Sequence, residues 1–181
     1  MPHPSPADVI DFWREAGETK WFSRDDAFDA AIRSHFLPLL EAAARGELGA
    51  LEATPDGALA LVILLDQFPR NLFRGASRAF ATDAQAREVA GRAIARGFDR
   101  QCDETLAFFL HMPFVHSEAL ADQERAVAFF ETLGWADASR SALEHRDIIA
   151  CFGRFPHRNA ALGRKTTPAE QRYLDEGGFK G

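Results

Sequence analysis

Three short segments of the sequence place an aromatic residue beside a proline and follow the pair with polar or charged side chains. They are residues 68–71 (FPRN), 112–118 (MPFVHSE) and 155–159 (FPHRN). An Arg-Gly pair at 74–75 and a Gly-Arg pair at 163–164 follow the first and the last. Because loops on a helical scaffold collect on a common face, we expect these turns to form one site.

The chemistry that these residue types favour is the binding of an anion. A guanidinium group presents a planar fork of donors that matches a carboxylate or a phosphate. The arginines near the turns form a local cationic excess in a chain of net charge -6. We therefore predict a pocket for a small anionic molecule or an acidic peptide. Its candidate ligand-binding residues are Asp66, Arg70, Asn71, Arg74, His116, Glu118, His145, Arg154, His157, Arg158, Asn159 and Arg164.

The same residues also admit a purely structural interpretation. A cation at the end of a helix satisfies free carbonyl groups and stabilises the helix by about 0.3–1 kcal/mol. Nearby carboxylates would then form an internal network of ion pairs. We expect at least one of Asp66 and Asp122 to be buried and bonded to an arginine or to loop amides. The carboxylates near the turns are Asp66, Glu118, Asp122, Glu144 and Asp147.

Two further function classes remain open. The first is an enzyme that uses Asp66, Glu118, His145 or His157 for acid–base chemistry, which needs carboxylates and imidazoles beside cations. The second is a protein-interaction adaptor in which the polar cluster only braces the fold. The sequence contains no Gly-x-Ser-x-Gly, P-loop or Gly-x-Gly-x-x-Gly motif, so the catalytic residues stay unknown.

Metal and nucleic-acid binding are disfavoured by the spacing of the residues. His116, His145 and His157 supply ligand types, but no two histidines stand four residues apart on one helix and no Cys–His cluster occurs. His145 shares a helical face with Ile149 and Phe152, which is typical of a histidine in or beside the core. An acidic chain without a basic stripe is also a poor partner for nucleic acid. We expect no metal and no cofactor.

The two cysteines indicate a reducing compartment. Cys102 and Cys151 form no Cys-x-x-Cys pair, and we predict both to be small core residues. No apolar run approaches the roughly 20 residues of a membrane helix, and the first six residues lack the features of a signal peptide. We therefore expect a soluble cytoplasmic protein with no membrane partner and with an oligomeric state that the sequence leaves open.

Composition and capping residues predict an all-helical chain. Alanine is abundant and only five valines occur, which favours helix over sheet. Ser5-Pro6 and Thr167-Pro168 are typical helix starts, and Gly46, Gly97, Gly134 and Gly153 suit helix ends. The predicted helices cover, within about two to four residues at each boundary, 6–16, 24–45, 55–67, 83–96, 103–112, 118–133, 137–153 and 168–176.

The apolar run at residues 58–65 predicts the centre of the fold, because a helix that is hydrophobic on every side must be buried. With no linker, residues 1–181 are predicted to form a single all-helical domain. Its architecture would be a set of antiparallel helical hairpins, as a short α-solenoid or an irregular bundle of about 8–9 helices. We expect Pro69, Pro113 and Pro156 each to stop the preceding helix. Phe68, Phe114 and Phe155 should anchor the turns to the core.

Taken together, these segments resemble the bacterial domain-of-unknown-function 924 family, which is placed among the tetratricopeptide-like helical folds. The resemblance implies an all-helical fold, but it brings no established reaction, cofactor or substrate. Two positions depart from the family pattern: Val115 stands where many members have an acidic residue, and Cys151 stands where arginine is usual. The matching blocks are residues 64–71, 73–75, 79–83, 112–118, 122–123, 145, 147–149, 153–159 and 162–164.

Overall fold

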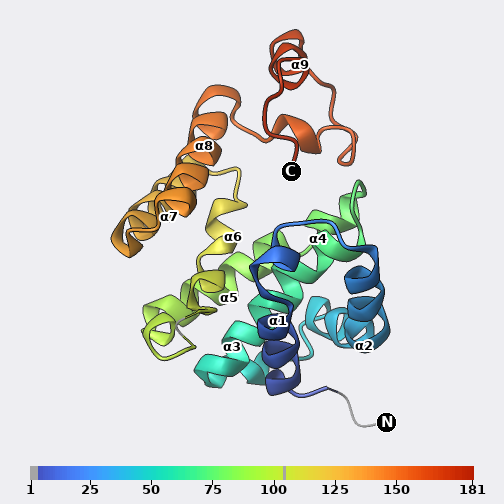
Figure 1. The fold of residues 1–181 in the computed structure, drawn as a ribbon, viewed down its shortest axis with the longest axis vertical. Helices are drawn as coiled ribbons and strands as arrows, with labels where there is room; N and C mark the ends of the chain where they lie inside the picture. Colours follow the sequence, from blue (N-terminus) through green and yellow to red (C-terminus); the bar gives the residue numbers. More distant parts are fainter. Residues whose placement is uncertain (1–3, 104) are drawn as a thin grey trace. The chain divides into compact units, whose positions relative to one another are not determined.

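The computed structural model describes residues 4–103 and 105–181, and within them it contains helices and turns but no strand (Figure 1). The prediction of an all-α fold is confirmed. The chain divides into two compact units. Unit 1 comprises Met1–Arg74 and Arg78–Pro113, and unit 2 comprises Gly75–Ser77 and Phe114–Gly181. This division does not test whether residues 1–181 form a single domain, so the single domain stays a prediction.

Unit 1 is built from the helices of the first half of the chain. Its α-helices are α1 (Pro6–Trp21), α2 (Asp26–Ala44), α3 (Pro55–Val62), α4 (Phe68–Leu72) and α5 (Asp83–Ala95). A π-helical turn, η2 (Ile63–Gln67), joins α3 to α4 without a break. The 3-10 turns are η1 (Gly49–Ala53), η3 (Ser77–Phe80), which begins in unit 2, η4 (Phe98–Arg100) and η5 (Ala107–Leu110).

Unit 2 contains one long helical hairpin and a short helix. The hairpin pairs α7 (Leu120–Leu133) with α8 (Ala136–Phe152), which lie side by side (Figure 1). Only Gly134 and Trp135 link them, so the two helices must run antiparallel. The 3-10 turn η6 (Pro156–Arg158) and α9 (Pro168–Asp175) follow, and α6 (Met112–Val115) spans the join of the two units.

The predicted capping residues begin and end the helices as expected. Ser5 and Asp8 form a capping box on α1, and Thr167 and Glu170 form one on α9. Gly134 and Gly153 both have φ 68° and end α7 and α8 in the left-handed conformation that glycine adopts without strain. Gly17 interrupts α1 with φ 68° and ψ 173°, one residue beyond the predicted helix end.

The predicted helix over residues 103–112 is wrong. The chain forms turns and the 3-10 turn η5 there instead, with Glu104 outside the described residues. Asp103 explains the difference, because its side chain accepts a hydrogen bond from the Thr105 amide at 2.9 Å. An aspartate that bonds to the backbone two residues ahead offers the chain an alternative to the α-helix.

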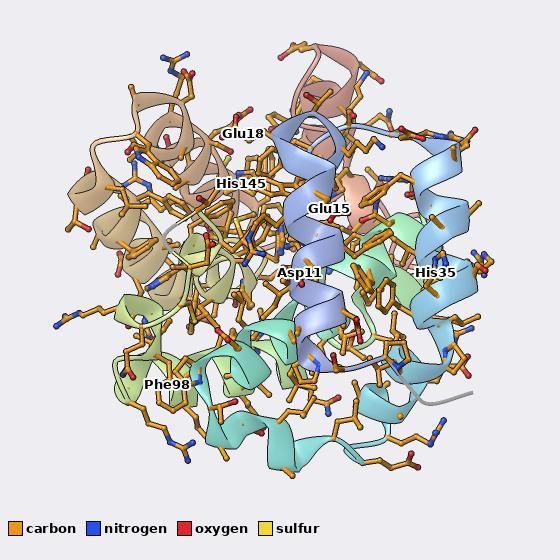
Figure 2. All side chains as sticks on the ribbon, turned by 60° about the horizontal axis from the view of Figure 1, so that its bottom comes forward. Asp11, Glu15, Glu18, His35, Phe98 and His145 are labelled. Atoms are coloured by element: carbon orange, nitrogen blue, oxygen red, sulfur yellow. The ribbon has the colours of Figure 1, made fainter. Side chains whose placement is uncertain are left out.

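The predicted core segment lies at the centre of unit 1. Every residue from Ala58 to Leu65 is buried, and α3 packs against both α1 and α5. Trp13 from α1 contacts the rings of Phe68 and Phe109, with centroid distances of 5.6 and 5.5 Å. The opposite face of α1 carries exposed carboxylates, which Figure 2 shows at Asp11, Glu15 and Glu18. Helix α1 is therefore amphipathic, with its apolar face on α3.

The prolines do not stop helices as predicted; each begins or enters a short helical segment. Pro69 lies in the first turn of α4, Pro113 is the second residue of α6, and Pro156 begins η6. At the start of η6, Pro156 is well suited because the amide hydrogen that it lacks would have no partner there in any case. The adjoining Phe68, Phe114 and Phe155 are buried, as predicted.

At Pro69 side chains replace the backbone hydrogen bond that proline cannot make. Proline has no N–H to donate to the carbonyl of Leu65, four residues earlier. The Leu65 carbonyl accepts a hydrogen bond from Thr82 Oγ1 at 2.5 Å instead. The neighbouring Asp66 carbonyl accepts one from Arg70 Nη1 at 2.7 Å. Side chains therefore satisfy the carbonyl groups that a regular helix would have used internally.

Neither cysteine is a buried core residue, so that prediction is wrong. Cys102 is half-buried, and Cys151 is exposed. The buried face of α8 is formed by Ala142, His145, Ile148 and Ile149, and position 151 falls outside it. The described part of the chain contains no helix that is long and apolar enough to cross a membrane.

The single-domain prediction can be tested by thermal unfolding with two probes. Replacing Trp135 with Phe leaves Trp13 and Trp21, both in unit 1, as the fluorescent reporters. If the two units unfold as one domain, fluorescence and far-ultraviolet circular dichroism will give the same midpoint. Midpoints that differ by several degrees would show that the units unfold separately.

Candidate functional site

The residues predicted to bind a ligand are divided between the two units. Unit 1 contains Asp66, Arg70, Asn71 and Arg74. Unit 2 contains His116, Glu118, His145, Arg154, His157, Arg158, Asn159 and Arg164. The first aromatic-proline turn therefore belongs to unit 1, the last to unit 2, and the middle one spans the join at Pro113 and Phe114, so the prediction that all three share one face stays a prediction.

In unit 1, Arg70 lies between two carboxylates. Its Nη1 atom is 3.1 Å from Asp66 Oδ1, and its two terminal nitrogens donate to both oxygens of Asp83 at 2.9 and 3.0 Å. Burial lowers the pKa of Arg70, but the charges of Asp66 and Asp83 outweigh it and the pKa is raised. The Asp66 side chain is completely buried, which confirms the prediction of a buried aspartate bonded to an arginine.

The remaining candidates of unit 1 hold α4 against α2. Asn71 Nδ2 donates to Asp29 Oδ1 at 2.8 Å. Arg74 donates to both oxygens of Asp29, each at 3.2 Å. Asp29 belongs to the first turn of α2, so these bonds connect two helices that are distant in the sequence. The contacts of the unit 1 candidates are those of a brace between helices.

In unit 2, Glu118 brings two of the predicted turns together. Its Oε1 atom accepts a hydrogen bond from the Phe155 amide at 2.8 Å, and Arg164 donates to its two oxygens at 2.7 and 3.0 Å. Arg164 also donates to the Phe155 carbonyl at 3.1 Å and to Asn159 Oδ1 at 3.0 Å. Burial raises the pKa of Glu118, but the bonds from Arg164 and Phe155 lower it by more. The net pKa is therefore lowered, and the group stays ionised.

A second ion pair fixes the chain after η6. Arg154 donates to both oxygens of Glu170 at 2.6 and 2.9 Å. Glu170 also accepts bonds from the Thr167 amide at 2.7 Å and from Asn159 Nδ2 at 3.3 Å. The bond from Arg154 is the largest cause that lowers the pKa of Glu170 to about 2. The capping residue of α9 is thus also a partner of the turn.

The third group in unit 2 surrounds the completely buried ring of Phe155. The Arg158 guanidinium lies 4.4 Å from the centroid of that ring. The imidazoles of His145 and His157 lie 5.5 and 5.6 Å from it. His145 comes from α8, while His157 and Arg158 come from η6, so the hairpin and the turn after it together form this group. We call these three side chains the Phe155 cluster.

Both imidazoles of the Phe155 cluster are neutral at pH 7. Burial is the largest cause that lowers the pKa of His145 to about 4, and the charges of His116 and Arg158 lower it as well. Burial and the charge of Arg158 lower the pKa of His157 to about 4. His145 Nδ1 lies 2.7 Å from the Ser141 carbonyl, so Nδ1 carries the proton and Nε2 is an acceptor. His157 Nδ1 is buried with no hydrogen-bond partner among the described residues.

His116 stands in a turn that a buried glutamine holds. Gln123 Nε2 donates to the carbonyls of Phe114, Val115 and Ser117 at 3.4, 2.7 and 2.6 Å. These bonds fix the backbone on both sides of His116, which is half-buried. Within the described residues no group of three or more His, Cys, Asp or Glu side chains is arranged to hold a metal ion.

The comparisons with known proteins agree with this fold. The family described as a bacterial protein of unknown function (DUF924) matches residues 9–178. The chain belongs to the DUF924 family. The solved structure of a protein of unknown function from Agrobacterium tumefaciens is similar to it, with a TM-score of 0.91 and 48% sequence identity. The match covers 95% of this chain and 97% of that chain. No curated protein matches the sequence.

Sequence reasoning missed several partners of the DUF924 arginines. Asp29, Asp83 and Glu170 all lie in the first turn of a helix, where acidic residues are common for capping reasons alone. Their pairing joins positions 13 to 45 residues apart, and no local spacing indicates it. By contrast, Glu144 and Asp147, which were predicted near the turns, are exposed on α8.

The brace in unit 1 predicts a large loss of stability when Arg70 is replaced by Ala. Two carboxylates, one of them completely buried, would lose their cation, which typically costs about 3–5 kcal/mol. Arg24→Ala is the matched control, because Arg24 pairs with Asp26 on the open surface. Urea denaturation should show the loss for Arg70→Ala and no measurable change for Arg24→Ala. Equal stability of the two variants would contradict the brace.

The buried imidazole predicts a loss of stability at acid pH. The unfolded chain protonates His145 below its ordinary pKa of 6.5, whereas the folded protein does so only near pH 4. This contribution is therefore fully present above pH 6.5 and is lost as the pH falls to 4, by about 3 kcal/mol. Denaturation midpoints of His145→Asn should fall less over this range than those of the wild type.

His35→Asn is the control for the acid effect. His35 also places Nδ1 against the carbonyl four residues earlier, at 2.9 Å from Ala31 O, but its ring is exposed on α2 (Figure 2). The pH dependence of His35→Asn should match that of the wild type. A response equal to that of His145→Asn would rule out burial of His145 as the cause.

Proposed function

We propose that this DUF924 protein binds a small anionic molecule, with a carboxylate or a phosphate group, at the Phe155 cluster of unit 2. One observation carries the proposal: the buried, charged Arg158 lies beside two imidazoles that remain neutral. Burial is the largest cause that lowers the pKa of both rings, and the Arg158 charge lowers both further, while the Glu118 charge raises that of His157. The Arg158 charge favours an anion near these rings.

The donor set suits an oxyanion. A guanidinium group can give two parallel hydrogen bonds to a carboxylate or phosphate. His157, whose Nδ1 has no hydrogen-bond partner among the described residues, can add one N–H, whereas the N–H of His145 is directed to the Ser141 carbonyl. Such bonds are stronger away from water than on the surface, because the local dielectric is lower. Burial of the cluster thus strengthens any hydrogen bond that a ligand makes there. An acidic peptide end offers the same chemical group.

In this proposal the other candidate residues hold the fold together and do not bind the ligand. Arg154 and Arg164 each hold a glutamate through two bonds, so in our proposal they position the turn and Arg158 binds the ligand. Asp66, Arg70, Asn71 and Arg74 keep unit 1 together. The antiparallel pair of α7 and α8 is the kind of hairpin that tetratricopeptide-like scaffolds repeat, so we retain that arrangement within the proposal. A cytoplasmic location is also part of the proposal.

An acid–base enzyme is the second candidate, and the tautomer of His145 favours it. Because Nδ1 is protonated, Nε2 is free to accept a proton. A pKa of about 4 makes this nitrogen a weak base near neutral pH, since catalysis is best served by a group whose pKa is close to the working pH. A bound anion would raise that pKa, so any catalysis would depend on the anion site.

Calorimetric titration with inorganic phosphate and with acetate tests the anion site. Replacing Arg158 with Gln should weaken binding at least about tenfold, because the fork of donors is lost. Arg74→Gln is the control, since Arg74 lies in unit 1 and braces Asp29. Circular dichroism establishes that both variants are folded. Unchanged binding in Arg158→Gln would refute this site.

The pH dependence of binding supplies a second measurement. A bound anion stabilises the protonated form of any nearby imidazole, so it raises a pKa that is about 4 in the free protein. Affinity for inorganic sulfate, which stays a dianion over this range, should therefore increase as the pH falls from 7 towards 4, with uptake of protons on binding. If affinity is independent of pH over this range, the imidazoles lie too far from the anion to belong to the site.

A further inference from the structure

Unit 1 contains a pocket of about 280 Å³ that is lined mainly by apolar side chains. It lies between the start of α1, the second half of α2, the turn η1 and the helix that runs from α3 into η2. Val9, Leu39, Ala60 and Leu64 are the fully buried part of its lining. Among the described residues that line it, none is a candidate ligand-binding residue of the sequence, so the pocket is separate from the Phe155 cluster.

Two alanines account for much of the space in the pocket. Ala42 of α2 and Ala60 of α3 both line it, at positions of two helices where larger apolar side chains would fill it. Protein interiors are close-packed, and space of this size lowers stability because the atoms that line it lack packing partners. A pocket that lowers stability is typical of a site kept for a function.

The walls of the pocket are held in place by contacts outside it. The capping box of Ser5 and Asp8 fixes the start of α1, where Pro4 and Pro6 form one side of the pocket. On the other side, a Cβ atom on Gly57 would overlap the Leu51 carbonyl, so glycine lets η1 lie directly on α3. These walls are fixed before any ligand arrives, as is usual for a small-molecule site.

A salt bridge to α5 holds η1 from its outer side. Both carboxylate oxygens of Glu52 accept hydrogen bonds from Arg92, at 2.7 and 2.9 Å. The Glu52 carbonyl accepts a further bond from Arg96 at 2.7 Å. Leu51, the residue before Glu52, is half-buried and lines the pocket. The apolar wall formed by η1 is therefore anchored to a second helix.

The chemistry of the lining favours an uncharged ligand. Glu47 is the one charged side chain in the described lining, and its two oxygens accept hydrogen bonds from Arg45 Nε and Nη2 at 2.7 and 2.9 Å. The two charges neutralise each other, so the pocket presents no net charge to a ligand. A charged group that enters an apolar pocket loses its hydration without a counter-charge to replace it.

We propose that this pocket binds an uncharged apolar molecule of up to about ten carbon atoms. An apolar cavity of about 150 Å³ can hold one benzene ring, so a pocket of about 280 Å³ can hold roughly ten carbon atoms. The pocket lies wholly in unit 1, so this inference does not depend on the anion site of unit 2. It assigns a second ligand class to the same chain.

Three probes of equal chain length test the proposed ligand class. 1-Hexanol, hexylamine and hexanoate are titrated separately into the full chain at pH 7, and methyl signals are followed by nuclear magnetic resonance. 1-Hexanol should shift the signals of Leu39 and Leu64 and leave those of Ile148 and Ile149, in unit 2, unchanged. Hexylamine and hexanoate should bind at least about tenfold more weakly, because each must bury its charge or leave carbons outside the pocket.

The Ala42→Leu variant tests whether the pocket itself is the site. The three added carbons would take the space of ligand carbons, each of which changes the affinity about fourfold. 1-Hexanol should therefore bind Ala42→Leu at least about tenfold more weakly than the wild type, while the thermal midpoint of the free variant stays equal or rises. Ala31→Leu, at a half-buried position of α2 outside the lining, should bind like the wild type. Ala42→Val is the smaller replacement if Ala42→Leu does not fold.

Each outcome supports or overturns the inference. Selective binding of 1-hexanol that Ala42→Leu weakens and Ala31→Leu does not supports the pocket. Tighter binding of hexylamine would show that Glu47 leaves Arg45 for a cation, which overturns the uncharged class. Binding that ignores Ala42→Leu would lie elsewhere on the surface, and the absence of any shift at Leu39 and Leu64 would make the space a feature of the fold alone. These results leave the anion site of unit 2 standing, because its test uses different probes and a variant of the other unit.

Discussion

The carboxylate of Glu118 is the interaction on which the polar half of unit 2 depends. It precedes α7 in the sequence, yet it accepts hydrogen bonds from the Phe155 amide and from both terminal nitrogens of Arg164. These bonds connect the chain entering the hairpin with the chain leaving it. The turn η6 carries His157 and Arg158, so Glu118 sets the position of both. This ionised group therefore helps to hold η6, with His157 and Arg158, against the hairpin that carries His145.

The two units use the same residue types for different purposes. In unit 1 the arginine of the FPRN segment has carboxylates on two sides, and the asparagine extends to Asp29. In unit 2 the corresponding asparagine links Arg164 to Glu170, and Arg158 stacks on an aromatic ring. Arg70 also lies over a ring, 5.8 Å from the centroid of Phe80, so each segment combines its arginine with an aromatic side chain. The two segments differ in which polar residues their asparagines connect.

The sequence predicted the elements whose determinants are local. The capping boxes of α1 and α9, the glycines that end α7 and α8, and the buried run at residues 58–65 follow from neighbouring residues alone. The helix predicted over residues 103–112 does not form, because the Asp103 side chain accepts a hydrogen bond from the backbone amide of Thr105. The ionic partners and the protonation states of the candidate site residues were not predicted. Both depend on burial and on contacts across many residues, and the spacing of residues does not encode either one.

The prolines show how context decides the meaning of a repeated motif. At Pro69 the preceding helix is apolar on every side and cannot end in the core, so it continues through a π-helical turn and the side chains of Thr82 and Arg70 satisfy its carbonyls. At Pro156 the preceding helix has already ended at Gly153, so the same motif begins a separate turn. Arg70 is therefore engaged by the backbone of its own helix, whereas Arg158 projects from a turn onto Phe155. The helix before the motif, more than the motif itself, determines whether its arginine bonds to the backbone of a continuing helix or stands in a separate turn.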